Sequence, residues 1–499
     1  MANIYTTARE AAGEGPEEPE GSAPPTTAAT DAPASALPSA APPLSPAAPG
    51  PTGPAWLGVL RHRAFRNVWL GAFGSSIGGW MEIVGVQWVM TVQTLSPEWV
   101  ASGRPGATLM LGYLSAAQLG PTLALGLWGG LVADRVDRKR LLLVTQVVMM
   151  LIAAALLVAS AAGRLTPAVM LVLSLLNGVA MAFNMPAWQV LTPRLVPREE
   201  LTKAITLNGM QFNMARVIGP GLAGVLMAQF GATVLFAVNT LSFLGVLLAV
   251  SSTPPAPPPP REDVKAWSQI REALRFTFRQ RGPLAIFTAL VLFSALAAPL
   301  VRMLPVFVQE VYHAEERVYG LLLALMGAGA VVGGLSLKWL PPWYPKHHFI
   351  PLSVLGGGAM IAAFSVMDSV LGASVFIFLC GAFWLWAFNS CMAAMQLLVD
   401  DRMRGRVMAV CNTAVFGVMP LGAIAAGWIS HIASGRADSG LGTQVGVGTL
   451  GAVLAAAGLV MLIWRTPEVD GLRPGDPGYE RRPSLLAGIT ARAHRPGPQ

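Results

Sequence analysis

Twelve apolar runs, each long enough for a membrane-spanning helix, dominate the sequence between residues 67 and 464. They lie near residues 67–95, 107–132, 141–162, 167–189, 204–228, 231–252, 283–309, 318–340, 348–367, 370–398, 407–432 and 443–464. A helix needs about 20 mainly apolar residues to cross a hydrocarbon core of ~30 Å. Charged residues make up only 12% of the chain, about half the share in soluble domains. The sequence therefore predicts an all-α membrane protein with twelve transmembrane helices.

The basic residues give an independent test of this topology, because Lys and Arg collect in short cytoplasmic loops. With the N-terminus inside, 28 of the 34 Lys and Arg residues fall on the cytoplasmic side and 4 in outer loops. The other two, Arg216 and Arg302, lie inside predicted spans. We expect a multi-pass protein of the cell inner membrane with both termini in the cytoplasm. Charges this scattered do not favour nucleic acid as a partner.

The pattern divides the chain into five parts. Their bounds are a disordered Pro/Ala-rich tail over residues 1–60, a six-helix bundle over 61–252, a linker over 253–282, a second six-helix bundle over 283–465 and a C-terminal tail over 466–499. In the linker, apolar residues recur at helical spacing between Val264 and Phe278. This predicts an amphipathic helix that lies either on the inner membrane surface or against the bundle.

The two bundles repeat each other in sequence. Gln189, Asn208 and Pro220 in the first bundle are followed by Gln396, Asn412 and Pro420 in the second, at offsets that drift by a few residues. Parallel six-helix repeats of this kind are typical of major facilitator transporters, whose binding site lies between the halves. The predicted fold is thus two pseudo-symmetric six-helix bundles.

The loop between the second and third spans carries a sharper motif, Gly129-Gly130-Leu-Val-Ala-Asp134-Arg135-Val-Asp137-Arg138-Lys139-Arg140. It resembles the signature loop of the major facilitator superfamily. With Pro186-Ala187-Trp-Gln189, Asn213-x-x-Arg216-x-x-Gly219-Pro220 and Arg404-Gly405-Arg406, it is similar to the transmembrane secretion effector branch, which includes enterobactin-exporter-like and macrolide-efflux-like proteins. The resemblance implies secondary active transport of a small molecule by a monomer that works by alternating access.

The signature loop predicts an inner gate formed by Gly130, Asp134, Arg135, Arg138 and Lys139. We expect Gly130 to let the second helix approach a neighbour closely. We expect Asp134 to pair with a basic group across the seam between the bundles. Asp137 replaces the second glycine of the family pattern, which leaves the geometry of this turn open.

Three ionisable residues lie deep in spans, where a charge is costly and indicates function by default. Glu82 lies in the first span, Arg216 in the fifth and Arg302 in the seventh. In this fold the first, fourth, seventh and tenth helices line the cavity, so the resemblance points Glu82 and Arg302 inward. Glu82 is the candidate for proton coupling or for binding a cationic cargo group; the alternative is a fixed Glu82–Arg pair that does not titrate. Arg216 either binds cargo or bonds to Asn213 and backbone carbonyls.

Other residues complete the candidate site. Gly219, Pro220 and Gly224 resemble part of the helix-five motif of drug exporters, in which Gly and Pro permit close packing and bending. This motif favours export over uptake. Polar side chains in the fourth and tenth spans are either cargo ligands or interhelical hydrogen-bond partners. These residues are Asn177, Asn184, Gln189, Asn389 and Gln396. The aromatic run over residues 383–388 either stacks on cargo or packs against lipid and neighbouring helices. We expect His347 and His348 to be solvated. We expect the three cysteines to be buried.

These features together predict an exporter, driven by protons, of a small amphipathic molecule such as a drug, a siderophore or a secondary metabolite. No enzymatic motif, cofactor site or metal-ligand spacing is present in the sequence. A lysophospholipid flippase or an uptake facilitator of the same fold stays open as the alternative. A non-transporting receptor or scaffold fits less well, because it needs no acid in mid-membrane.

Overall fold

A computed structural model describes residues 57–471, apart from 192–193, 255–265, 340–344, 435–439 and 465. Most of the two predicted tails lies outside the described residues, as do the side chains of Asp134 and Gln189. All regular elements in the described part are helical. The described residues belong to one compact unit.

The first half of the fold contains six long helices. They are α1 (Arg63–Thr94), α3 (Ala107–Arg135), α4 (Arg138–Ala161), α5 (Pro167–Leu191), α6 (Leu201–Phe230) and α7 (Thr233–Ser251). Three short elements accompany them, namely η1 (Leu57–Arg61), α2 (Pro97–Ala101) and η3 (Arg198–Glu200). We call these helices the N-terminal half.

The second half also contains six long helices. They are α9 (Arg281–Val306), α10 (Glu316–Ser336), α11 (Lys346–Ser365), α12 (Val370–Leu398), α13 (Asp401–Ser434) and α14 (Gly440–Ile463). The shorter α8 (Ala266–Arg279) precedes them, the π-turn η4 (Phe307–Val311) extends α9, and η6 (Pro467–Asp470) follows α14. We call α9 to α14 the C-terminal half.

The twelve long helices coincide with the twelve predicted spans. Nine of the described helices are long and apolar enough to cross a membrane by composition alone. The three long helices outside that group are α1, α3 and α6. Two of them carry Glu82 and Arg216, and such charged side chains lower the mean hydropathy of a helix.

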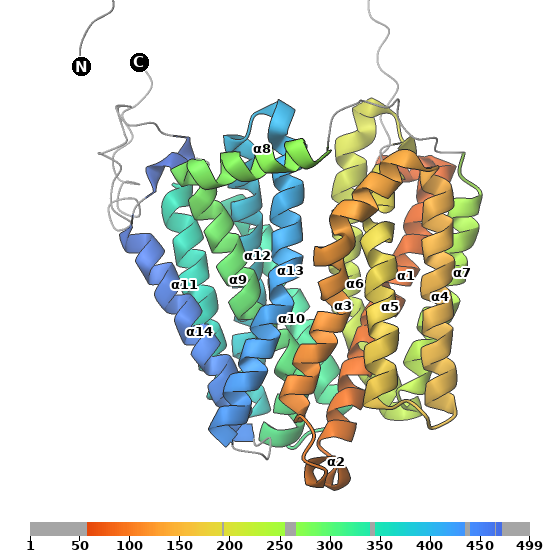
Figure 1. The fold of residues 1–499 in the computed structure, drawn as a ribbon, viewed down its shortest axis with the longest axis vertical. Helices are drawn as coiled ribbons and strands as arrows, with labels where there is room; N and C mark the ends of the chain where they lie inside the picture. The colour runs from red at the N-terminus through yellow and green to blue at the C-terminus, as the bar shows by residue number, and fades with distance from the viewer. Residues whose placement is uncertain are drawn as a thin grey trace, which may run out of the picture. The chain divides into compact units, whose positions relative to one another are not determined.

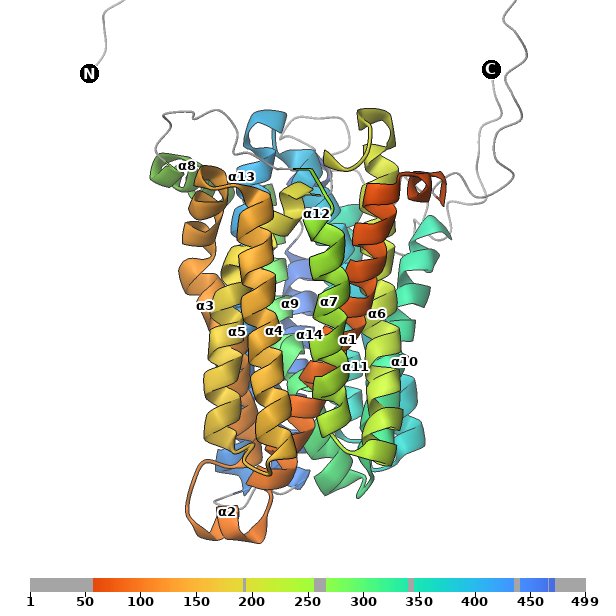
Figure 2. The same cartoon turned by 90° about the vertical axis from the view of Figure 1, so that its right-hand side faces the viewer.

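The helices run up and down between two ends of the bundle, which we name after α8 and α2 (Figure 1). The predicted cytoplasmic loops of the described chain lie at the α8 end. Figure 1 shows the two halves converging toward the α2 end and diverging toward the α8 end. The N-terminal helices face the viewer in Figure 2, where α4 and α7 stand on the outer side of α1, α3 and α5.

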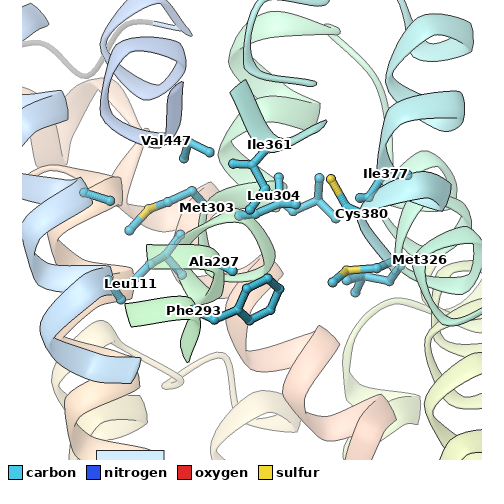
Figure 3. Close-up of a cluster of buried hydrophobic side chains, with 14 of the residues drawn as sticks. Leu111, Phe293, Ala297, Met303, Leu304, Met326, Ile361, Ile377, Cys380 and Val447 are labelled. Carbon is cyan, nitrogen blue, oxygen red and sulfur yellow. The ribbon is translucent and has the colours of Figure 1, made fainter. Parts of the chain in front are cut away.

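The largest group of buried apolar side chains surrounds α9 (Figure 3). Phe293, Ala297, Met303 and Leu304 of α9 are all buried, and side chains from α3, α10, α11, α12 and α14 meet them. In a bilayer the tails are as apolar as these side chains, so close van der Waals packing rather than removal from water holds such helices together. Small residues that let backbones approach are therefore as important as bulky ones.

Local signals explain two of the tight connections. Asp137 is the N-cap of α4, and its carboxylate accepts the amide of Arg140 at 3.0 Å. An acidic N-cap stabilises a helix start, which gives Asp137 a role where the family pattern has glycine. At the far end of α6, Gly231 adopts a positive φ of 76°, a conformation that favours glycine, and lets α7 begin two residues later.

Helix α8 packs on the bundle, which is the second of the two placements that the sequence left open. Ala273 and Thr277 are fully buried, and Glu272 forms an ion pair with Arg406 of α13 at 3.3 Å. The ring of Phe278 meets Phe287 of α9 edge-on, with centroids 5.3 Å apart. The linker is thus attached to the C-terminal half.

Helix α9 contains two internal prolines, Pro299 and Pro305. A proline lacks the amide that would bond the carbonyl four residues earlier, which for Pro299 is the carbonyl of Ala295. Gly422 of α13 lies directly against that carbonyl oxygen, with no room for a side chain.

Candidate transport site and gate

Glu82 is held by an amide rather than by a cation. Asn239 of α7 is 2% exposed, and its Nδ2 donates to Oε2 of Glu82 at 2.5 Å. Ser242, one turn further on, donates to the backbone carbonyl of Asn239 at 2.7 Å. No basic side chain pairs with Glu82 in the part of the chain that the structure describes. The fixed Glu82–Arg pair considered from the sequence is not formed there.

Arg216 lies in a cluster of aromatic side chains that joins the two halves. Its guanidinium Cζ is 5.4 Å from the ring centroid of Trp384 on α12. Trp384 meets Phe293 edge-on at 5.4 Å, and Phe212, one turn before Arg216, lies 6.3 Å from Trp80 of α1. We call Trp80, Phe212, Arg216, Phe293 and Trp384 the aromatic cluster. Cation–π attraction of this kind is strengthened where water is excluded.

Arg216 does not make the contacts that the sequence offered as its structural role. The amide of Asn213 donates instead to Gly209 of its own helix at 2.9 Å. Within the described residues, Arg216 has no ion pair and no hydrogen bond to a side chain or carbonyl. Its guanidinium faces the ring of Trp384.

Two side-chain hydrogen bonds cross between the halves near the α2 end. Nη1 of Arg302 donates to Oε1 of Gln118 at 2.7 Å, and the hydroxyl of Tyr319 donates to Oε1 of Gln87 at 2.6 Å. The ring of Tyr319 also stacks on Trp88, with centroids 5.8 Å apart. Arg302 thus joins α9 to α3, and Tyr319 joins α10 to α1.

The helix-five motif packs α6 closely against two helices at once. A Cβ on Gly219 would lie 2.6 Å from Cβ of Trp80, and a Cβ on Gly224 would lie 2.9 Å from Cα of Gly320 in α10. Pro220 lies between them and is buried. The close approach expected from this motif is present on both faces.

A matching contact joins α3 and α13 on the other side of the molecule. A Cβ on Gly427 would lie 2.9 Å from Cα of Leu109, and one on Gly112 would lie 3.0 Å from Cα of Ile424. These four residues lie in the half of each helix nearer the α2 end. Both long seams between the halves are therefore closed by backbone contact.

In the signature loop, the packing role belongs to Gly129 and not to Gly130. A Cβ on Gly130 would meet nothing within 4 Å, whereas one on Gly129 would collide with the carbonyl of Ala182 in α5. The expectation for Gly130 was wrong by one position. Successive residues of a helix point about 100° apart, so Gly129 faces α5 and Gly130 does not.

The basic residues of this loop differ in exposure. Arg135 is exposed, while Arg138 is buried and its Nε donates to the carbonyl of Ala133 at 3.3 Å. Nζ of Lys139 donates to the carbonyl of Ser251 at 2.7 Å, at the end of α7. The side chain of Asp134 lies outside the description, so its pairing stays a prediction.

The polar candidates of the fourth and tenth spans separate into several environments. Asn184 is buried and donates to Thr145 of α4 at 2.8 Å, which is interhelical bonding within the N-terminal half. Oδ1 of Asn177 is buried without a hydrogen-bond partner in the described chain. Asn389 and Gln396 are exposed, and the side chain of Gln189 is not described. The structure does not bring these residues together with Glu82.

A cavity of about 370 Å³ lies away from all of these residues, inside the C-terminal half. It is bounded by α9, α11, α14 and the segment after α14. His347 lines it and is bonded to Asp470, and both His347 and His348 are buried. The expectation that the two histidines are solvated was wrong, because they belong to the first turn of α11 rather than to a loop.

No cluster of His, Cys, Asp or Glu that could hold a metal occurs in the described residues. The three cysteines are buried and unpaired, as the sequence predicted.

Comparison with known proteins identifies the family to which this chain belongs. Residues 55–480 match the transmembrane secretion effector family. The staphyloferrin A transporter of Staphylococcus aureus is 24% identical over 70% of this chain and 85% of its own length. The enterobactin exporter EntS of Citrobacter koseri is 27% identical over 69% of this chain and 80% of its own length.

Solved structures agree on the fold. A bacterial homologue of the human lysosomal transporter Spinster, in an inward-facing and unoccupied conformation, matches with a TM-score of 0.60 and 15% identity, over 81% of this chain and 95% of that one. A D-xylose–proton symporter matches with a TM-score of 0.60 and 14% identity, over 81% and 99% of the two chains. The chain is therefore a multi-span membrane transporter of the major facilitator superfamily and belongs to its transmembrane secretion effector family.

Proposed function

We propose that this transporter exports a small amphipathic molecule in exchange for protons, by alternating access between the two halves. The observation that carries the proposal is the Glu82–Asn239 pair, a membrane-embedded carboxylate with a neutral partner. Exporters among the relatives support the direction of transport.

An asparagine suits a carboxyl group that changes its protonation state. Its amide nitrogen donates to an ionised carboxylate, and its amide oxygen can accept a bond from the protonated acid. Asn239 can therefore hold Glu82 in place in both states by reorienting its amide. An arginine partner would favour the ionised state alone.

The cross-half contacts support a resting state that is closed at the α2 end. Gly224 against Gly320, Gly427 against Leu109 and the Tyr319–Gln87 bond all lie toward that end. In this state Glu82 would exchange protons with the α8 side, which we place in the cytoplasm. Arg302 acts here as a gate residue through Gln118 rather than as a ligand for cargo.

The aromatic cluster is our candidate for cargo recognition. Trp80, Phe212 and Trp384 offer flat apolar surface, and Arg216 offers a guanidinium without an acidic partner in the described chain. The names of the relatives, a staphyloferrin A transporter and an enterobactin exporter, favour a siderophore among the candidate cargoes. Drugs and secondary metabolites remain in the same chemical class of amphipathic molecules.

The remaining parts of the proposal concern placement. We place the protein in the cell inner membrane as a monomer with both termini in the cytoplasm, and the bundle boundaries at residues 61–252 and 283–465. The signature loop with Asp134, Arg135, Arg138 and Lys139 would then act as the inner gate.

The test is transport by purified protein in proteoliposomes with and without a pH gradient, with staphyloferrin A and enterobactin as the first cargoes. Glu82→Gln should abolish the stimulation by the gradient while it preserves cargo exchange without a gradient. Glu98→Gln, on the short exposed helix α2, is the matched control and should behave as wild type. A Glu82→Gln variant that still responds fully to the gradient would overturn proton coupling through this residue.

A further inference from the structure

The cavity in the C-terminal half opens toward the bilayer rather than toward the space between the halves. Two residues of α14 that line it, Val460 and Trp464, are 57% and 76% exposed. Helix α14 stands at the edge of the bundle that is farthest from the N-terminal helices (Figure 1). The exposed side of these residues therefore faces lipid.

The chemistry of the walls selects an apolar occupant. The lining side chains of α9 and α14 are apolar, apart from Thr288. Water enters a cavity of this size only where polar partners are available, and the few here stand near one end. A cavity that is apolar and continuous with the membrane interior is filled by hydrocarbon.

The α8 end of the cavity is closed by η6. The carboxylate of Asp470 accepts the backbone amide of Lys346 at 2.7 Å and bonds Nδ1 of His347. Val469 is buried in the cavity wall, and Glu468 lies against Gly282 at the start of α9. Segment η6 thus forms a lid at the starts of α9 and α11, where we expect the lipid head groups.

Two cations beside this lid have no acidic partner among the described residues. Arg281 lies one turn before the lining residue Ala285, and Lys346 is adjacent to the lining residue His347. Neither side chain forms an ion pair in the described part of the chain, whereas Asp470 is already bonded. Both cations are at the amino ends of helices, where an anion is additionally favoured.

From this arrangement we propose that the cavity binds one acyl chain of an anionic phospholipid from the surrounding bilayer, with the phosphate between Arg281 and Lys346. The site is separate from the transport site and does not depend on the proposed function. A basic pocket between helices near the membrane surface is a recognised way to hold an anionic head group.

The direct test is photo-crosslinking of the full-length protein in nanodiscs. The probes are phosphatidylglycerol and phosphatidylcholine that carry the same diazirine-labelled acyl chain, and mass spectrometry locates the adducts. We expect phosphatidylglycerol adducts on residues 285–292 and 457–464, at least fivefold more abundant than those of phosphatidylcholine. Adducts spread evenly over all lipid-facing helices, or equal for the two lipids, would overturn the proposal.

Two kinds of variant separate the chain site from the head-group site. Ala285→Trp fills the cavity and should remove the adducts, whereas Val453→Trp, on the exposed face of α14 outside the cavity, should leave them. Arg281→Gln combined with Lys346→Gln should remove the preference for phosphatidylglycerol without loss of folding, since both positions are at helix ends. Persistence of that preference in the double variant would contradict the phosphate site.

Discussion

The two ends of the seam between the halves differ in how closely the halves approach each other. Toward the α2 end, backbones touch at Gly224 with Gly320 and at Gly427 with Leu109. At the α8 end, the described ion pair of Glu272 with Arg406 joins α8 to α13 within the C-terminal half and does not cross the seam, and both side chains are partly or fully exposed. Figure 1 shows the same asymmetry in the spacing of the helices.

The difference shows which contacts stabilise this conformation over the alternative one. Backbone contacts at glycine are short-ranged, and a separation of only ~1 Å removes up to about half of their attraction. Exposed ion pairs contribute little and reform easily with water and salt. We therefore expect the contacts at the α2 end to break together in one step. The contacts at the α8 end should instead rearrange gradually as the halves move.

The largest effect should come from Gly224→Leu. A leucine has no room against Gly320, and overpacking costs about 1–3 kcal/mol, which shifts a two-state equilibrium by roughly 5- to 150-fold. The α2 end should open and transport should fall by at least tenfold. Spin labels at positions 104 and 313, in loops of the two halves at this end, should report a longer distance. Gly209→Leu on the same helix has open space and should change neither readout.

A smaller effect is expected for Tyr319→Phe. The variant keeps the stack on Trp88 but removes the hydroxyl that donates to Gln87. Loss of one such bond should shift the same equilibrium roughly threefold to tenfold toward the open α2 end. Tyr113→Phe, on the lipid-exposed part of α3, serves as the control for a lost hydroxyl. An unchanged distance distribution in Tyr319→Phe would show that the glycine contacts alone hold the seam.

Arg406→Ala tests the other end of the comparison. Its ion pair with Glu272 is 3.3 Å long and exposed, so we expect a cost of at most about 1 kcal/mol. Transport should remain within twofold of wild type, and added salt should not change it further. A tenfold loss would mean that α8 is part of the gate and that the contrast between the ends is wrong.

The smallest effect concerns Glu200 of η3, which bonds His62 at 2.8 Å and Arg61 at 2.5 Å ahead of α1. The hydrogen bond with His62 and the charge of Arg61 hold the pKa of Glu200 below its usual value. Because the folded pKa is the lower one, this contact stabilises at neutral pH and is lost as the pH falls through that pKa. The melting temperatures of wild type and Glu200→Gln should differ by a few degrees at pH 7 and converge below pH ~4. A constant difference would exclude an ionic contribution.

The sequence was sufficient to predict the spans and the fold, because a bilayer imposes one length on every helix. Family membership followed from motifs in the correct order, and the helix-five motif packs as predicted. The N-cap at Asp137 could also have been read from the sequence, since aspartate is a preferred residue directly before a helix start.

The partners of the in-span charges could not be predicted. Asn239, Gln118 and Trp384 lie on helices far away in the sequence from the charges they contact. Periodicity does not show which face of a transmembrane helix meets protein. Both faces of such a helix are apolar, so the usual contrast between core and surface is absent. The displacement of the packing role from Gly130 to Gly129 has the same origin, whereas the burial of His347 follows from the start of α11 at Lys346, before the predicted start of that span.

The contact of Gly422 with the carbonyl of Ala295 has a mechanical consequence. The oxygen lost its helical partner to Pro299, and the neighbouring helix reaches it only where a side chain is missing. Sliding α13 along α9 by one residue would drive a methyl or isobutyl group into that oxygen. The contact therefore fixes the register between α9 and α13, so the two helices must move together when the C-terminal half tilts.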